Sequence, residues 1–241
     1  MASVIAVYGE SGAGKTTSLE RLDPSYTFII DADGKGLPWK GWRGQYNAEN
    51  KNYIKADTQA LVYQCMKQVD TNPDYAHVKV LVIDTLNGIM VEEERIHRME
   101  KGYDKWSDLA WNVWDIVLYA NKMRDDLTVV MLAHVQVEND DNGYRYRRIK
   151  TSGRKLSKLT LESKLQNLYY AFRDDEGQYV FRVKADNDVS KSSHGLYDTE
   201  TVPNDMLDCV NKLREFEWGD QMPPLKPKGE TKTETKGKRN A

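Results

Sequence analysis

Short apolar runs alternate with segments of helical periodicity along the first 140 residues. Four apolar runs predict buried strands, at 3–8, 26–31, 78–84 and 127–137. The run at 78–84, VKVLVID, is continuously apolar, which is typical of a strand covered on both faces of a parallel sheet. Apolar side chains that recur every three or four residues predict helices over 15–22, 58–69 and 106–124.

The remaining pattern predicts an antiparallel edge. Asn142-Gly143 is a strong hairpin signal between 127–137 and 144–150, and the runs 167–173 and 179–185 form a second antiparallel pair. The fold class is therefore α/β, with a mostly parallel central sheet flanked by helices and an antiparallel edge. The segment 34–56 is rich in glycine and aromatic residues without a period, so we expect a loop over a site or a partner surface.

Composition places the chain among soluble globular proteins. Of 241 residues, 39% are hydrophobic and 30% are charged, and no stretch reaches the ~20 apolar residues that cross a bilayer. The first residues enter a strand without the pattern of a secretory leader. Cys65 and Cys209 lack partners at metal-ligand spacing, so we expect reduced thiols. These features predict a cytoplasmic protein that does not contact a membrane.

We expect one domain over residues 1–218 and a disordered basic tail over 219–241. The last twenty residues hold six Lys/Arg and two Glu and have almost nothing to bury, whereas the whole chain has a net charge of -2. Such a tail either keeps the protein in solution or tethers it weakly to nucleic acid, and the sequence leaves both open.

The segment GESGAGKT at 9–16 has the spacing of a phosphate-binding loop. A strand precedes it and a helix is expected after it, which is the context that this loop requires. Its glycines let backbone N–H groups face an anion, and Lys15 reaches the β- and γ-phosphates of a nucleotide. The predicted ATP-binding residues are Gly9, Glu10, Ser11, Gly12, Ala13, Gly14, Lys15, Thr16 and Thr17.

A magnesium ion is expected beside the phosphates. The hydroxyl of Thr16 supplies one ligand, and Asp84, which closes the buried strand 78–84, supplies a second. An aspartate that only caps the next turn is the alternative for Asp84.

Hydrolysis also requires a group that orients or deprotonates water. Asp31 and Asp33 end the strand 26–31, and we assign the role to Asp33, with Glu10 as the rival base. His134, near the end of the strand 127–137, stands where a polar side chain senses the γ-phosphate. A histidine satisfied within the core is the alternative for His134.

The segments GESGAGKT, FIIDADG, VLVIDT and VVMLAHV, in this order and spacing, resemble the ATPase core of the RecA-like superfamily. They are most similar to the short bacteriophage RecA-like ATPases associated with single-strand annealing and recombination. The likeness spans about residues 3–190 and implies a RecA-like P-loop NTPase core. It assigns phosphate and Mg²⁺ binding to Lys15 and Thr16, metal support to Asp84 and the sensor position to His134.

The resemblance has two further implications. Asp33 falls where the family usually has a catalytic glutamate, and the shorter side chain implies slow hydrolysis. Members of the family often share a nucleotide between subunits, and Arg182, Lys184 and Lys191 are the candidates for reaching the phosphates of a neighbouring subunit. Solvated charges on an edge strand are the alternative for these three residues.

The segment 143–158 reverses the local sign of charge. It holds seven basic residues and no acidic one, interleaved with tyrosines that are able to stack on unpaired bases. The predicted DNA-binding residues are Tyr144, Arg145, Tyr146, Arg147, Arg148, Lys150, Arg154, Lys155 and Lys158. A regular strand over 144–150 would put Tyr144, Tyr146 and Arg148 on one face and Arg145 and Arg147 on the other, whereas a mobile loop would avoid that division.

Together these features predict an ATPase that depends on ATP and Mg²⁺, binds single-stranded DNA and promotes annealing or recombination. We expect a homo-oligomer, as a ring or filament, that acts in a phage-infected bacterial cell, with a single-strand-binding protein as a further partner. Two alternatives stay open. One is a nucleotide or small-molecule kinase. The other is a nucleotide-gated protein-binding module with negligible hydrolysis, favoured by the aromatic loop with Trp39, Trp42, Tyr46 and Tyr53.

Overall fold

A mixed β-sheet forms the centre of the computed structural model. The structure describes residues 1–229 except 100–103, 140–142, 144, 152–159 and 186–187, and it describes only the backbone of 104–110 and 145. The strands are β1 (Ser3–Gly9), β2 (Thr27–Asp31), β3 (Tyr53–Lys55), β4 (Val80–Asp84), β5 (Thr128–Asn139), β6 (Arg145–Ile149), β7 (Asn167–Arg173), β8 (Tyr179–Arg182) and β9 (Thr201–Pro203).

The strand order across the sheet is β3-β2-β4-β5-β1-β7-β8-β9, and β6 pairs with the far half of β5. The six strands from β3 to β7 run parallel, while β8 and β9 extend the sheet antiparallel and β5 and β6 form an antiparallel hairpin. The predicted fold class, an α/β core with a mostly parallel sheet and an antiparallel edge, is confirmed.

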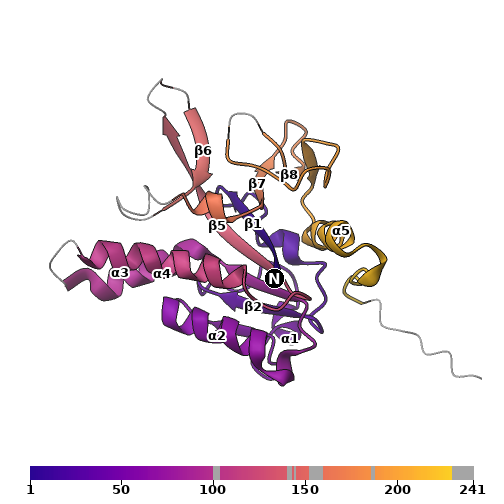
Figure 1. Cartoon of the computed structure of the whole chain (residues 1–241), viewed down its shortest axis with the longest axis horizontal. Helices are drawn as coiled ribbons and strands as arrows, with labels where there is room; N and C mark the ends of the chain where they lie inside the picture. Colours follow the sequence, from indigo (N-terminus) through magenta and orange to yellow (C-terminus); the bar gives the residue numbers. More distant parts are fainter. Residues whose placement is uncertain (100–103, 140–142, 144, 152–159, 186–187, 230–241) are drawn as a thin grey trace, which may run out of the picture.

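Helices cover both faces of this sheet (Figure 1). One face carries α2 (Gln59–Thr71), α3 (Leu86–Ile96) and α4 (Asp104–Ala120), and the other carries α5 (Met206–Trp218) and the loop with the short α1 (Trp42–Gln45). Single 3-10 turns lie at Thr17–Leu19, Pro73–Tyr75, His97–Met99, Leu161–Lys164 and Gly219–Gln221.

Each central strand feeds two cores because its side chains alternate between the faces. In β1, Val4, Ala6 and Tyr8 join the cluster under α2, α3 and α4. Ile5 and Val7 join the cluster under α5. All five are buried, which explains the continuous apolar run. Cys65 packs in the first cluster and Cys209 in the second, so both stay free thiols.

Several element predictions were wrong. The helix expected over 15–22 is only the 3-10 turn Thr17–Leu19, because the N–H groups of Leu19, Glu20 and Leu22 each donate to the carbonyl three residues earlier. The helix α3 was not expected from the sequence, and Thr85 caps its N-terminus by accepting from Gly88 N. The helix α5 and the strand β9 had no counterpart in the sequence prediction.

The segment 34–56 is a packed loop that contains α1 and β3. Trp39 and Tyr46 are buried, with their rings edge to face at 6.0 Å, and Trp42 packs on Tyr53 at 5.3 Å. Its aromatic residues therefore build the core, which removes the main feature that favoured a protein-docking loop.

The chain beyond α5 stays bound to the body. Leu225 and Asn211 exchange two hydrogen bonds, of 2.7 and 2.9 Å, and Lys228 N donates to the carbonyl of Arg21 at 3.0 Å. The tail predicted over 219–241 therefore does not leave the body at 219. Its residues 230–241 lie outside the described part of the chain.

Candidate nucleotide site

The carboxyl ends of neighbouring strands meet around one cavity. Gly9 of β1 lies opposite His134 of β5 in the parallel register, and Asp84 of β4 lies opposite Leu132 of the same strand. A cavity of about 320 Å³ opens there. It is lined by Ser11, Gly12, Gly14, Lys15, Thr16, Thr17, Asp31, Asp33, Lys35, Gly36, Leu37, Pro38, Asp84, Thr85 and His134. Ligands of open α/β sheets bind at this edge.

The loop after β1 is shaped to hold an anion. Gly12 and Gly14 have φ of +79° and +87°, values that favour glycine. In the described structure the N–H groups of Gly12, Gly14 and Lys15 donate to no protein acceptor, while Ala13 N closes the loop onto the carbonyl of Glu10 at 3.2 Å. Backbone N–H groups left free in such a concave loop bind phosphate.

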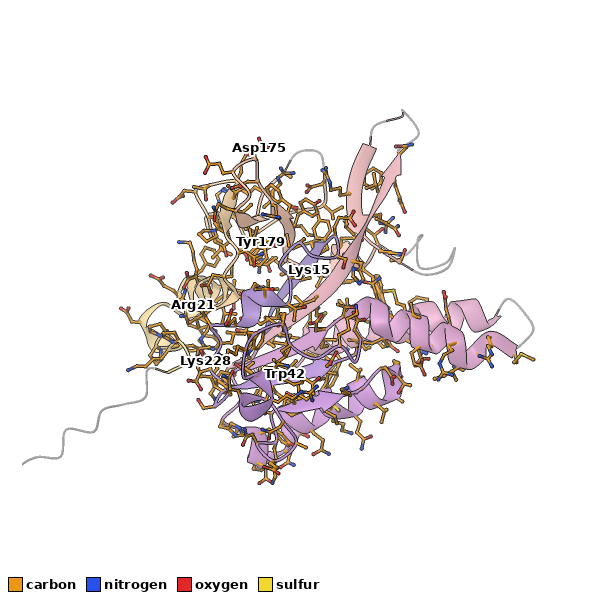
Figure 2. All side chains as sticks on the ribbon, turned by 180° about the vertical axis from the view of Figure 1, so that it is seen from behind. Lys15, Arg21, Trp42, Asp175, Tyr179 and Lys228 are labelled. Carbon is orange, nitrogen blue, oxygen red and sulfur yellow. The ribbon has the colours of Figure 1, made fainter. Side chains whose placement is uncertain are left out.

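Neighbouring strands fix the position of this loop. A Cβ at Gly9 would lie 2.5 Å from the carbonyl oxygen of Ala171 in β7, and one at Gly14 would lie 2.9 Å from the ring of Tyr179 in β8. Figure 2 labels Lys15 and Tyr179 close together at the centre of the molecule. Of the predicted residues, Gly9, Glu10 and Ala13 do not line the cavity, since Ala13 is packed in the core and the side chain of Glu10 is exposed.

Lys15 lies inside the loop. Lys15 is 7% exposed, and its Nζ donates to the carbonyls of Gly9 at 2.9 Å and Glu10 at 2.8 Å. Burial lowers the pKa of Lys15, and the nearby carboxylate of Asp84 opposes that shift. A buried cation held only by two neutral carbonyls is well placed to neutralise a phosphate.

Thr16 and Asp84, the two residues predicted to hold magnesium, contact each other. The hydroxyl of Thr16 donates to Oδ2 of Asp84 at 2.8 Å. Burial raises the pKa of Asp84 to about 6, and the carboxylates of Asp33 and Asp31 add to that shift. A buried carboxylate that lacks an adequate counter-charge fits a divalent cation. In the described residues no three His, Cys, Asp or Glu side chains form a closed metal cage, and Mg²⁺ usually takes one or two protein ligands plus water and phosphate.

Asp33 lies at the cavity wall with both oxygens engaged. Oδ1 accepts from the hydroxyl of Thr85 at 3.1 Å, and Oδ2 pairs with Nζ of Lys35 at 2.6 Å. A Cβ at Gly88 would lie 2.7 Å from Oδ1 of Asp33, so only glycine fits there. Thr85, Lys35 and Gly88 are site residues that the sequence analysis missed.

Asp31 has a structural role. Its Oδ2 accepts from the N–H of Gly36 at 2.8 Å and from the hydroxyl of Tyr53. These bonds hold the loop after β2 against the cavity. Asp33 thus stays a cavity-lining carboxylate and the candidate base, whereas the rival base Glu10 is exposed and lies outside the cavity lining.

His134 lines the cavity on the side of β5. Burial lowers the pKa of His134, and the cations Lys15, Lys35 and Lys150 add to the shift, so the imidazole is neutral at pH 7. The backbone of His134 is fixed on both sides. Its N–H donates to Oδ1 of Asn87 at 2.6 Å, and its carbonyl accepts from the N–H of Lys150 at 2.7 Å.

A family model described as an AAA domain matches residues 1–194, most of the chain. The chain belongs to this AAA domain family. No curated protein matches the chain. Membership indicates nucleotide binding and, in general terms, ATPase activity, which agrees with the phosphate loop, the Thr16–Asp84 pair and the cavity.

The basic segment of this AAA domain is a hairpin strand where the structure describes it. In β6, Tyr146 lies opposite Glu138 and Arg148 lies opposite Gln136 of β5. Arg147 and Lys150 are exposed, and the guanidinium of Arg147 lies 5.2 Å from the ring centre of Tyr170. Tyr146 donates to the carboxylate of Glu138 at 2.9 Å. The predicted contacts Tyr144, Arg154, Lys155 and Lys158 lie outside the described residues, as does the side chain of Arg145.

Arg148 was wrongly assigned to DNA binding. It is 7% exposed, and its guanidinium pairs with Glu162 and Glu138, each at 3.3 Å. Glu162 is buried too and also accepts from the N–H of Ile149 at 3.0 Å. Arg148 therefore neutralises carboxylates that fasten β6 to the body.

The three cations expected to act on a neighbouring subunit are bound within their own chain. Arg182 pairs with Asp188 at 3.4 Å, Lys184 donates to the carbonyl of Tyr197, and Lys191 donates to the carbonyl of Glu162 at 2.7 Å. None of the three lines the nucleotide cavity of the chain. Their role between subunits stays a prediction.

Proposed function

We propose that this AAA domain is an ATPase that depends on ATP and Mg²⁺, binds single-stranded DNA and promotes annealing or recombination, as a RecA-like homo-oligomer of the kind found in phages. The observation that carries the proposal is the continuity of β5. This strand places His134 at the cavity, runs on to Asn139 and pairs with the basic strand β6. One strand thus joins the nucleotide cavity to the cationic hairpin.

A backbone hydrogen bond at the end of β6 also connects the hairpin to His134. Lys150, just after β6, donates its N–H to the carbonyl of His134. The side chain of Lys150 is exposed, as is that of Arg147. A shift of His134 on nucleotide binding would therefore move the backbone that carries these cations.

Among the helices that the structure describes, none has the length and apolar character that a membrane span requires.

The test is a binding titration with single- and double-stranded DNA at several salt concentrations, with and without Mg·ATP. We expect the wild type to bind single strands more tightly with ATP. The double variant Arg147→Ala/Lys150→Ala loses at least tenfold affinity at low salt, and its salt slope falls by roughly 0.7 for each phosphate contact removed. Lys67→Ala, on the exposed side of α2, is the matched control.

A second control separates the nucleotide from the DNA. Lys15→Ala is expected to abolish both ATP binding and nucleotide-dependent assembly, measured by sedimentation, while low-salt DNA binding without ATP stays unchanged. Absence of DNA binding at low salt, together with ATP hydrolysis that single strands do not alter, would refute the DNA half of the proposal and leave the ATPase standing.

A kinase is the second candidate, and one observation favours it. A second cavity of about 340 Å³ shares Asp33, Lys35 and His134 with the first and continues to Asp57, Asn87, Glu92 and Lys150. A phosphoryl acceptor in this second cavity would face the γ-phosphate. Incubation with labelled ATP and nucleoside monophosphates decides the matter, since a kinase puts the label on the acceptor and an ATPase releases it as free phosphate.

A further inference from the structure

We propose that Lys35 is a catalytic cation that acts within its own chain: it pairs with Asp33 in the structure and moves to the terminal phosphate when ATP binds. This inference rests on the proposed ATPase function and adds to it a residue outside the phosphate loop. In the described structure Nζ of Lys35 lies 2.6 Å from Oδ2 of Asp33, and the side chain is 70% exposed. Lys35 lines both the nucleotide cavity and the second cavity.

The backbone around Lys35 is anchored on one side. Gly34 and Gly36 have φ of +67° and +77°. Gly36 N donates to Oδ2 of Asp31, and a Cβ on Gly36 would lie 2.6 Å from the ring of Trp42. Lys35 therefore stands on a loop held against the cavity, while its own ammonium group has Asp33 as its partner. The side chain is able to swing while its attachment point stays in place.

The two lysines at the cavity lie in different environments. Among the described lining residues, the cations are Lys15 and Lys35. Lys15 is buried and held by the carbonyls of Gly9 and Glu10, whereas Lys35 stands on the side of Asp33 and His134. Arg182, Lys184 and Lys191 have partners elsewhere. Lys35 is thus the exposed lysine at the end of the cavity where water would attack.

Charge provides the reason for the swing. An ion pair with one exposed partner contributes little to stability, so Lys35 is easily drawn away from Asp33. A γ-phosphate carries more negative charge than a carboxylate and offers three oxygens. When Lys35 leaves, Oδ2 of Asp33 is free to accept a hydrogen bond from water, while Oδ1 keeps its bond from Thr85.

Water then displaces ADP from the γ-phosphorus. The water oxygen forms a bond to the γ-phosphorus as the bond from that phosphorus to the β–γ bridging oxygen breaks. The proton of the water passes to Asp33, and ADP leaves with the electron pair on its β-phosphate. Lys35 stabilises the charge on the γ-phosphate oxygens during transfer, a role for which fixed cations have large effects on rate.

The experiment compares Lys35→Ala, Lys35→Met and Lys35→Arg with wild type. Lys40→Ala is the matched control, an exposed lysine of the same loop that does not line the cavity. For each protein, the affinities for Mg·ATP and Mg·ADP and the turnover number are measured. We expect Ala and Met to lower turnover on the order of 10²-fold. The same two variants are expected to bind Mg·ATP about tenfold more weakly, while their affinity for Mg·ADP stays within twofold of wild type. Lys35→Arg is expected to recover part of the turnover and part of the ATP affinity.

The Asp33→Asn background separates direct contact from an effect through Asp33. If Lys35 touches the phosphate, Lys35→Ala still weakens ATP relative to ADP in that background. If Lys35→Ala does not weaken ATP binding in the Asp33→Asn background, direct contact of Lys35 with the phosphate is overturned. The proposal is also overturned if Lys35→Ala alone keeps both turnover and the preference for ATP over ADP within twofold of wild type. If the wild type binds ATP but does not hydrolyse it, the ratio of ATP to ADP affinity in the Lys35 variants decides the proposal. A wild type that binds no nucleotide refutes the proposed function itself, and this inference falls with it.

Discussion

Single residues at this site are placed for chemistry at a cost in stability. Asp84 is the clearest case, because its carboxylate is buried beside Asp31 and Asp33 and its pKa rises to about 6. The hydroxyl of Thr16 and the ammonium of Lys15 offset only part of that cost. Such a group is poorly satisfied until a cation arrives, and that makes it useful for binding one.

Asp84→Asn is expected to stabilise the protein without nucleotide. The unfolded carboxyl ionises near pH 4 and the folded one near pH 6, so the folded state loses stability as pH rises through that window. Above it the penalty is about 3 kcal/mol. Urea denaturation is expected to show Asp84→Asn more stable than wild type by up to that amount at pH 7.5, and equal to it near pH 4.

The exposed Asp175 in the turn between β7 and β8 provides the control. Asp175→Asn is expected to change stability little at either pH. Added Mg²⁺ and nucleotide should reverse the ranking of Asp84→Asn and wild type, because only wild type gains binding energy. An Asp84→Asn variant no more stable than wild type at pH 7.5 would show that the buried carboxylate is already compensated.

At the level of elements, the β5–β6 hairpin combines a buried ion pair with an exposed cationic face. Arg148 and Glu162 are both buried, and Glu162 also holds the backbone of Ile149. Arg147 is exposed and rests on Tyr170. The two adjacent arginines therefore serve different purposes, one in folding and one on the surface.

This difference yields a paired prediction. Arg148→Met leaves the buried carboxylate of Glu162 without its counter-charge, and we expect a loss of about 3 kcal/mol in the free energy of unfolding. Arg147→Ala removes one contact of the guanidinium with a ring and is expected to cost less than about 1 kcal/mol. Chemical denaturation measures both. An Arg148→Met variant as stable as Arg147→Ala would contradict the structural role assigned to Arg148.

The same hairpin shows how far sequence reasoning reaches. The hairpin signal at Asn142-Gly143 indicated a return of the chain, but a regular strand and a mobile loop over 144–150 both stayed open. The burial of Arg148 was not expected, because Glu162 comes from a turn 14 residues later and no local pattern indicates that they meet. Thr85 and Gly88 escaped for the same reason, since their meeting with Asp33 depends on how β2 and β4 pair. Lys35 follows Asp33 by two residues, and only its place at the cavity depends on the fold.

Local signals were sufficient where chemistry is contiguous in the chain. The phosphate loop is one segment, and Asp84 closes a run of buried aliphatic side chains. Local signals were misread where charge masked periodicity. In α3 the buried Leu86, Ile89, Met90 and Glu93 have helical spacing, but Glu93 is the middle one of three consecutive glutamates that an arginine follows. Glu93 belongs to that buried face because it accepts from Gln59 N at 2.8 Å.

Across the whole molecule, the segment 222–229 joins the two ends of the chain. It connects Asn211 of α5 with Arg21 and Tyr26, which precede β2, and Lys228 lies 5.8 Å from the ring centre of Trp39. Figure 2 shows Arg21 and Lys228 on the same side of the molecule. Trp39 belongs to the loop whose residues Gly36, Leu37 and Pro38 line the nucleotide cavity, so this segment supports the cavity wall from behind.

Truncation tests that support. A chain ending at Gln221 loses the paired bonds of Leu225 with Asn211, the bond of Tyr26 to the carbonyl of Lys226 and the packing of Leu225. Net hydrogen bonds contribute about 1 kcal/mol each, so we expect a loss of about 2 to 3 kcal/mol by urea denaturation and a lower nucleotide affinity. A chain ending at Gly229 keeps every one of these contacts and is the control, expected to match the full chain. If both truncated chains have the stability and nucleotide affinity of the full chain, residues 222–229 rest on the surface without supporting the cavity wall. If only the stability falls and nucleotide affinity is kept, the segment supports α5 alone.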